Sequence, residues 1–175
     1  MNSSWRRIER FIESRDRTLI GWSEICESGL APRAAVMDWL GSTVEAGTAG
    51  HDVVMSPTNS CYLDYWQSTN HAIEPPAFGA DVSLAKVYSF EPVPANLAAQ
   101  FQLHIVGAQG NLWTEHVPSL KDAQYMAFPR LCAIAEVAWS RKSSRGYDDF
   151  TRRLQTQFQR FDQLGVSYMS RGLAR

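Results

Sequence analysis

The sequence predicts an α/β fold in which parallel strands alternate with helices. Two observations lead to this prediction: short apolar runs bounded by glycine or proline recur between residues 18 and 113, and segments with helical spacing separate them. The pattern fits a doubly wound sheet or half of a (β/α)₈ barrel, and it does not decide between the two. With 175 residues, of which 45% are apolar and 20% charged, the chain is long enough for one globular domain with a core.

The spacing of apolar residues and the residues that begin or end helices and strands predict the first elements. Residues 4–16 place apolar side chains at helical intervals between charged ones, which predicts an amphipathic helix. Short apolar runs predict strands, and the clearest of them is stopped by Pro57. A serine or threonine in the N-cap position begins the second helix that lies between strands. The strands are predicted at 18–22, 34–39 and 52–56, and the intervening helices at 24–30 and 42–49.

The second half begins with a long polar stretch. Residues 66–83 are rich in Gln, Ser, Asn, Pro and Gly, and a loop of this length in a compact domain is usually functional or a crossover. Residues 103–113 are predicted to form a strand that runs into a polar loop. The predicted helices lie at 84–88, at 121–139 with Pro129 as a kink or restart, and at 147–164, where Gly165 ends the helix.

The charge pattern excludes several classes of function. The formal net charge is −1, from 17 basic and 18 acidic residues, and no basic run or stripe is present. We therefore expect no nucleic acid and no anionic membrane surface as partners. No apolar run approaches the roughly 18 residues that a spanning helix needs, and Met1 to Arg7 contain no apolar segment of the secretory-signal kind.

The cysteines do not form a metal site by their spacing. Cys26, Cys61 and Cys132 are far apart, with no CxxC pair and no zinc-type spacing to a histidine. Buried or half-buried thiols are the favoured interpretation, and one disulfide stays open. We accordingly expect neither a bound metal nor a cofactor.

Six tryptophans in 175 residues are unusually many. An indole ring can stack on the face of a sugar, or it can simply fill a core. Without further information, Trp22 and Trp39 favour a place in the core. Trp5 and Trp139 look like helix-packing residues, and Trp66 lies in the predicted loop.

Five ordered motifs carry a resemblance to a known family. They are IGWSE at 20–24, WLG at 39–41, YLD at 62–64, GAQGNLWTE at 107–115, and FPR at 128–130 followed by AEVAWS at 135–140. Together they resemble the second half of the family 20 glycoside hydrolases, the β-N-acetylhexosaminidases, from about Arg6 to Ser167. The resemblance implies that residues 1–175 are the C-terminal half of a (β/α)₈ catalytic barrel, with about four parallel strands and no separate second domain.

The resemblance also implies an amino-sugar glycoside as substrate and a site for it. Each implied site residue follows a predicted strand, where active sites of such barrels are built. Trp22, Trp39 and Trp113 are implied to form aromatic walls. Tyr62 is implied to donate a hydrogen bond to the acetamido carbonyl oxygen in catalysis. Asp64 and Glu115 are implied to accept hydrogen bonds from sugar hydroxyls.

One departure from the family pattern concerns the chemistry itself. The family places its proton donor in an Asp-Glu dipeptide at the end of the fourth strand, and no Asp-Glu dipeptide occurs in this sequence. The arginine of the first strand that holds sugar hydroxyls is also missing. We therefore expect the chain alone to be inactive. The alternative is a non-catalytic carbohydrate-binding or interaction module, and a truncation or a misplaced start codon stays open. Ser23 stands where the family usually has Asp, with little expected effect.

Three further expectations concern partners and single residues. Half a barrel leaves two unpaired strand edges, so we expect self-association or pairing with the missing N-terminal half. Glu136 is expected to pair with Arg130 or another base, and His116 to be structural rather than catalytic. The resemblance leaves a periplasmic or secreted location open for the intact protein.

Overall fold

The structure is a computed structural model that describes residues 3–170. The chain divides into two compact units. Unit 1 comprises the chain up to Thr58 together with Glu91–Gln109, and unit 2 comprises Asn59–Phe90 together with the chain from Gly110. The prediction of a single partial barrel domain over residues 1–175 stays a prediction.

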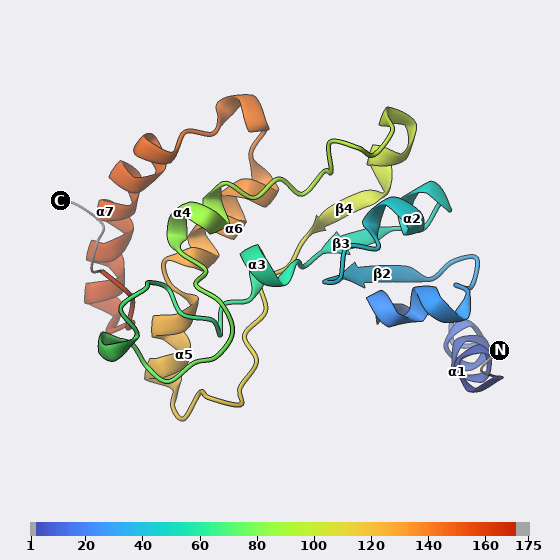
Figure 1. The fold of residues 1–175 in the computed structure, drawn as a ribbon, viewed down its shortest axis with the longest axis horizontal. Coiled ribbons are helices and arrows are strands. Elements are labelled where there is room, and N and C mark those ends of the chain that lie inside the picture. Colours follow the sequence, from blue (N-terminus) through green and yellow to red (C-terminus); the bar gives the residue numbers. More distant parts are fainter. Residues whose placement is uncertain (1–2, 171–175) are drawn as a thin grey trace. The chain divides into compact units, whose positions relative to one another are not determined.

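Unit 1 is built on a parallel sheet (Figure 1). Among the described residues its order is β1-β2-β3-β4, with Gly21 opposite Val36 and Val36 opposite Val53. Val36 and Val53 are fully buried, which explains why these short apolar runs form inner strands. The prediction of four parallel strands with helices is confirmed. The strands are β1 (Ile20–Trp22), β2 (Ala35–Asp38), β3 (Val53–Met55) and β4 (Ile105–Ala108).

The connections of unit 1 differ in detail from the predictions. The helix predicted at 24–30 is a 3₁₀ helix, η1 (Ser23–Ser28). The strand predicted from residue 103 begins at Ile105, because the preceding residues belong to the 3₁₀ helix η3. The remaining helices are α1 (Ser3–Glu13), α2 (Thr43–Thr48) and η3 (Ala99–His104).

Unit 2 is mainly helical. The helix predicted over 121–139 is interrupted before Pro129, so the interpretation of a restart is confirmed. Gly165 adopts a left-handed φ of 66° and ends the last helix, as predicted. The elements are α3 (Thr58–Cys61), η2 (His71–Ile73), α4 (Leu84–Tyr88), α5 (Leu120–Ala127), α6 (Arg130–Trp139), η4 (Lys142–Ser144) and α7 (Tyr147–Leu164).

The core of unit 2 lies where α7 meets α4 and α6. The apolar stripe predicted on α7 is buried along its whole length. It packs against Val87 of α4 and Ile134 of α6, which are also buried. Trp139, however, is 94% exposed, so the prediction that it packs within the helix layer is wrong for unit 2. The stripe consists of Phe150, Leu154, Phe158 and Phe161.

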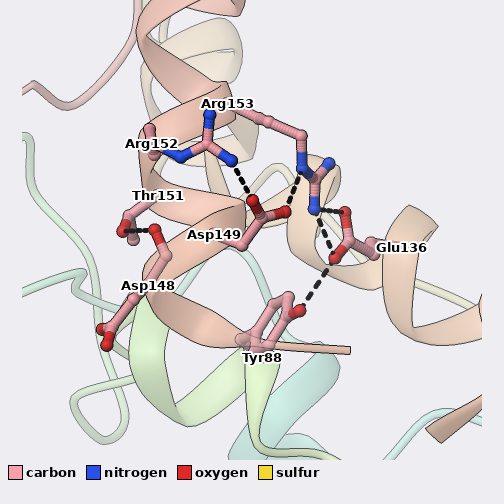
Figure 2. A network of polar contacts seen from close by, with 7 residues as sticks. All are labelled: Tyr88, Glu136, Asp148, Asp149, Thr151, Arg152 and Arg153. Carbon is pink, nitrogen blue, oxygen red and sulfur yellow. Dashed lines mark hydrogen bonds and ion pairs between the residues drawn. The ribbon is translucent and has the colours of Figure 1, made fainter. Parts of the chain in front are cut away.

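A polar network ties α4, α6 and α7 together (Figure 2). The hydroxyl of Tyr88 donates to Glu136 Oε1 at 2.8 Å, and Arg153 donates to both oxygens of Glu136 at 2.8 and 2.7 Å. Arg153 also donates from Nε to Asp149 Oδ2 at 2.7 Å. Glu136 therefore pairs with Arg153 and not with Arg130, because the second turn of α7 brings Arg153 to it.

Replacing Tyr88 by Phe should destabilise unit 2 by about 1 kcal/mol, because the half-buried Glu136 carboxylate loses one of its donors. Urea unfolding followed by circular dichroism measures the change. The matched control is Tyr168→Phe, whose hydroxyl donates to Asp162 in an exposed bond, and it should cost about 0.5 kcal/mol or less. Equal losses in the two variants would contradict the role given to the network.

The thiols and the histidines offer no metal site in the described part of the chain. Cys26, Cys61 and Cys132 are free, and burial raises the pKa of Cys61 to about 12. Residues 3–170 contain no group of three or more His, Cys, Asp or Glu side chains that could hold a metal ion. Over the same range, no helix has both the length and the apolar character required to cross a bilayer.

Candidate functional site

Two of the predicted aromatic walls lie at the same edge of the sheet in unit 1. Trp22 is the last residue of β1, and Trp39 directly follows β2. Because β1 and β2 are parallel and Trp22 lies opposite Met37, the carboxyl ends of both strands meet at one edge. Both indoles are half-buried. This edge is where α/β folds place their ligands.

A buried aspartate organises the turn that carries Trp39. Asp38 is 1% exposed and accepts backbone hydrogen bonds from Gly41, Ser42 and Thr43 at 2.8–2.9 Å. It also accepts the hydroxyl of Ser23 at 2.9 Å and those of Ser42 and Thr43. Burial raises the pKa of Asp38, but the hydrogen bonds outweigh burial and leave it lowered. The start of α2 is therefore capped by Asp38 and not by the side chain of Ser42.

Two residues next to Trp22 hold Trp39 in place. The hydroxyl of Ser23, which is 3% exposed, accepts the backbone N–H of Trp39 at 3.0 Å. The indole Nε1 of Trp39 donates to Glu24 Oε2 at 3.2 Å. The IGWSE motif thus supplies one predicted wall in Trp22 and supports the other through Ser23 and Glu24. Its sequence had indicated no such function for Ser23.

The other four predicted residues lie on two neighbouring segments of unit 2. Tyr62 and Asn111 form a parallel bridge, with Leu63 N donating to Asn111 O and Asn111 N to Cys61 O, both at 2.7 Å. Tyr62 is 9% exposed, and its ring centroid lies 6.3 Å from that of Trp113. The structure therefore brings the YLD and NLWTE motifs together.

The second motif has a closely packed glycine where the two segments meet. A Cβ on Gly110 would lie 2.8 Å from Ile134 Cδ1 and 3.1 Å from Leu63 Cδ1. Real Cβ atoms do not show the first of these distances, so a side chain here would require the end of the Ile134 side chain to shift. Gly110 thus allows close packing against α6.

Asp64 is a buried carboxylate with unused acceptor capacity. It is 2% exposed, and neither oxygen makes a hydrogen bond of ordinary geometry with the described residues. Burial raises its pKa, Glu115 adds to this, and the backbone N–H groups of Asp64 and Trp113 act in the opposite direction. A buried carboxylate is costly unless it receives hydrogen bonds, so a ligand that supplies hydroxyl donors would satisfy it.

Glu115 and Trp113 lie at the surface of unit 2, next to an aromatic cluster. Trp113 is 39% exposed, and Glu115 is exposed. The cluster continues from Tyr62 to Tyr65 and from there to Phe78 of the long loop, each pair with centroids 5.6 Å apart. The predicted loop over 66–83 is confirmed apart from η2. The sequence pattern did not indicate that Tyr65 and Phe78 join the site.

A groove of about 720 Å³ elsewhere in unit 2 is not the candidate site. It lies between α6 and α7 and is lined by Glu136, Trp139, Arg153 and Arg160, among others. None of the six residues predicted to contact the sugar lines it. The predicted residues lie instead at the strand ends of unit 1 and, within unit 2, on the two motifs around the Tyr62 bridge.

Comparison with known proteins gives a clear result. The family model of the glycosyl hydrolase family 20 catalytic domain matches residues 1–142. The chain belongs to this family. The family 20 chain is 38% identical over 166 residues to a β-hexosaminidase of Porphyromonas gingivalis, covering 93% of this chain and 21% of that protein. It is 30% identical over 164 residues to a β-N-acetylhexosaminidase of Cellulomonas fimi, covering 90% of this chain and 32% of that protein.

Solved structures agree on the fold. A family 20 exo-β-N-acetylglucosaminidase of Vibrio harveyi, in complex with N-acetylglucosamine, matches with a TM-score of 0.81 and 29% identity, over 93% of this chain and 26% of that one. The family 20 β-N-acetylhexosaminidase of Streptomyces coelicolor matches with a TM-score of 0.85 over 96% of this chain and 35% of that one; at 23% identity it shows the fold alone. The predicted partial (β/α)₈ barrel is confirmed. This family 20 chain spans about a fifth to a third of the length of the relatives it matches.

Proposed function

We propose that this chain supplies the acetamide- and sugar-binding part of a β-N-acetylhexosaminidase. The activity would be hydrolysis of terminal, non-reducing β-linked N-acetylglucosamine or N-acetylgalactosamine with retention of configuration. The observation that carries the proposal is the parallel bridge at Tyr62, which places Tyr62 beside Trp113 and leaves the buried carboxylate of Asp64 without ordinary hydrogen bonds. Family membership makes amino sugars the substrate class to test first.

The proposed chemistry is substrate-assisted. The carbonyl oxygen of the sugar's own acetamide attacks the anomeric carbon, the glycosidic bond breaks, and a cyclic oxazolinium forms that water then opens. In this scheme the hydroxyl of Tyr62 donates to the acetamide oxygen and fixes its direction of attack. Trp22, Trp39 and Trp113 each present an apolar face to the sugar and exclude water from it. Asp64 and Glu115 accept hydrogen bonds from sugar hydroxyls.

The proton donor of this scheme lies outside these 175 residues. The Asp-Glu dipeptide that would orient the acetamide nitrogen and protonate the leaving oxygen does not occur in the sequence. The same observation favours a second candidate function, a non-catalytic carbohydrate-binding module that keeps the pocket. Affinity separates the two candidates, because a part of a pocket should bind a monosaccharide weakly, whereas a dedicated module should bind it in the micromolar range.

The partner proposal follows from the sheet. Among the described strands, β1 and β4 each have a single strand neighbour, and unpaired edges invite pairing with another chain. We therefore propose that the chain associates with a second copy or with polypeptide that supplies the remaining strands. Sedimentation of the purified chain tests the first possibility, and a single monomeric species at all concentrations would contradict it.

Titration with N-acetylglucosamine tests the binding function directly. The indole N–H signals of Trp22, Trp39 and Trp113 in ¹H-¹⁵N NMR spectra should shift with a dissociation constant in the millimolar range. Asp64→Asn should weaken binding about tenfold, because a charged acceptor of hydroxyl hydrogen bonds is lost. The control Asp148→Asn, on an exposed side chain of α7, should leave the affinity unchanged. Indole signals that stay unmoved at saturating sugar would contradict the proposal.

A further inference from the structure

Arg130 is a fully buried cation in unit 2 whose function the family motif does not explain. It is 0% exposed and begins α6, where a positive charge opposes the helix dipole. A buried guanidinium without a carboxylate partner is costly. The cost of burying this charge must be offset by interactions that Arg130 makes in the folded protein.

Its hydrogen bonds all go to backbone carbonyls of three separate segments. NH1 donates to Val82 O at 2.9 Å, and NH2 donates to Met126 O at 2.8 Å and to Leu63 O. Leu63 is the residue between Tyr62 and Asp64. Arg130 thus holds the peptide that carries the two predicted sugar-contacting side chains on either side.

The charge of Arg130 acts on the same segment. Burial lowers the pKa of Arg130 to about 9, against the opposing influence of Glu74 and Asp64. In return, the guanidinium lowers the pKa of Asp64, which burial raises. The three carbonyls accept hydrogen bonds from the terminal nitrogens of Arg130, and Nε is buried without a partner among the described residues. Neutral carbonyls do not balance the charge, so Asp64 is one of the groups that balance it through space.

We propose that Arg130 is a positioning residue of the sugar pocket, which fixes the Tyr62–Asp64 segment through the carbonyl of Leu63 and whose positive charge acts on the buried carboxylate of Asp64. The expected effect of Arg130 on sugar affinity rests on the proposed sugar-binding function. The hydrogen bonds of Arg130 do not depend on it. A merely structural arginine would hold the three carbonyls without influencing the titration of Asp64.

The test compares Arg130→Met, which removes charge and donors, with Arg130→Lys, which keeps the charge but cannot reach all three carbonyls. ¹³C NMR titration follows the carboxyl of Asp64, identified by its absence in Asp64→Asn. We expect Arg130→Met to raise the pKa of Asp64 and Arg130→Lys to leave it near the wild-type value. Arg130→Lys should still weaken binding of N-acetylglucosamine about tenfold, because the segment loses its fixed geometry.

The matched control is Arg153→Lys, which alters the pair with Glu136 on α7 and should change neither the Asp64 titration nor the sugar affinity. An unchanged Asp64 pKa in a folded Arg130→Met protein overturns the proposal. If both Arg130 variants fail to fold, Asp64→Asn gives the reciprocal measurement: the pKa of Arg130, followed at Cζ, must fall, and no change overturns the proposal.

The two proposals fail in distinguishable ways, because the titrations use no sugar. Coupling between Arg130 and Asp64 in a chain that binds no N-acetylglucosamine would count against the proposed function. Sugar binding without coupling would count against the role of Arg130.

Discussion

The 175-residue chain alone should release no more chromophore from a chromogenic N-acetylglucosaminide than buffer does. The reason is the missing proton donor: departure of the glycosidic oxygen requires a proton, and the sequence holds no Asp-Glu pair to deliver it. In the proposed scheme, Tyr62 and the tryptophans orient the acetamide and supply no proton to the leaving group. The measurement is a rate assay at high protein concentration and several pH values.

Activity should appear when the missing strands are supplied. The N-terminal part of the Porphyromonas gingivalis β-hexosaminidase, up to the segment that this chain matches, is a suitable second polypeptide because the two sequences are 38% identical where they align. In such a complex, Tyr62→Phe should lower kcat by about 10²–10³-fold, because the donor that directs the acetamide oxygen is lost.

Tyr88→Phe provides the control for this loss, since it also removes one hydroxyl from unit 2 but acts on Glu136 in the helix layer. It should leave kcat within about twofold of the wild-type complex. Enzyme-like turnover by the chain alone, abolished by Tyr62→Phe, would show that the acidic pair is dispensable and would end this scheme.

Asp38→Ala should destabilise unit 1 by about 3 kcal/mol. The substitution leaves the donors of Ser23, Gly41, Ser42 and Thr43 without their acceptor in a buried turn, and unpaired buried donors are expensive. Urea unfolding monitored by Trp fluorescence measures this loss, because the same turn carries Trp39.

The neighbouring aspartate supplies the control. Asp52 lies directly before β3, its side chain is 59% exposed, and its ion pair with His104 spans 3.3 Å. Asp52→Ala should therefore change stability by about 0.5 kcal/mol or less. A loss at Asp52 as large as that at Asp38 would indicate that the sheet, and not the hydrogen-bonded turn, is sensitive to these changes.

The pH dependence of stability provides an independent check on Asp38. Its pKa is lowered in the folded state, so its contribution is present above the unfolded value of about 3.9 and is lost as pH falls through the folded value. The contribution of Asp64 to stability changes with pH in the opposite direction. Its pKa is raised in the folded state, so ionisation of Asp64 lowers stability as pH rises through the folded value. Replacing Asp38 by Asn should flatten the acid limb of the curve, whereas Asp64→Asn should remove the loss on the neutral side.

The spacing of apolar residues along the chain predicted most helices and strands and gave wrong predictions at two places. The strands at β1, β2 and β3 and the buried stripe of α7 follow from apolar spacing, which depends on neighbours close in sequence. The start of β4 was misplaced because residues 103 and 104 continue a 3₁₀ helix. The cap of α2 was misassigned because Asp38 lies in the preceding strand, outside the local window that capping rules use.

The sequence by itself determined the family, the alternating architecture and the six residues to test for sugar binding, because ordered motifs and apolar period are properties of the chain. Only the tertiary structure decided which side chains support them. Arg130 bonds to Leu63, 67 residues away, and Glu136 pairs with Arg153 and not with Arg130. Burial and long-range hydrogen bonds arise only when distant segments pack, and no spacing along the chain encodes which carbonyl a buried guanidinium will reach.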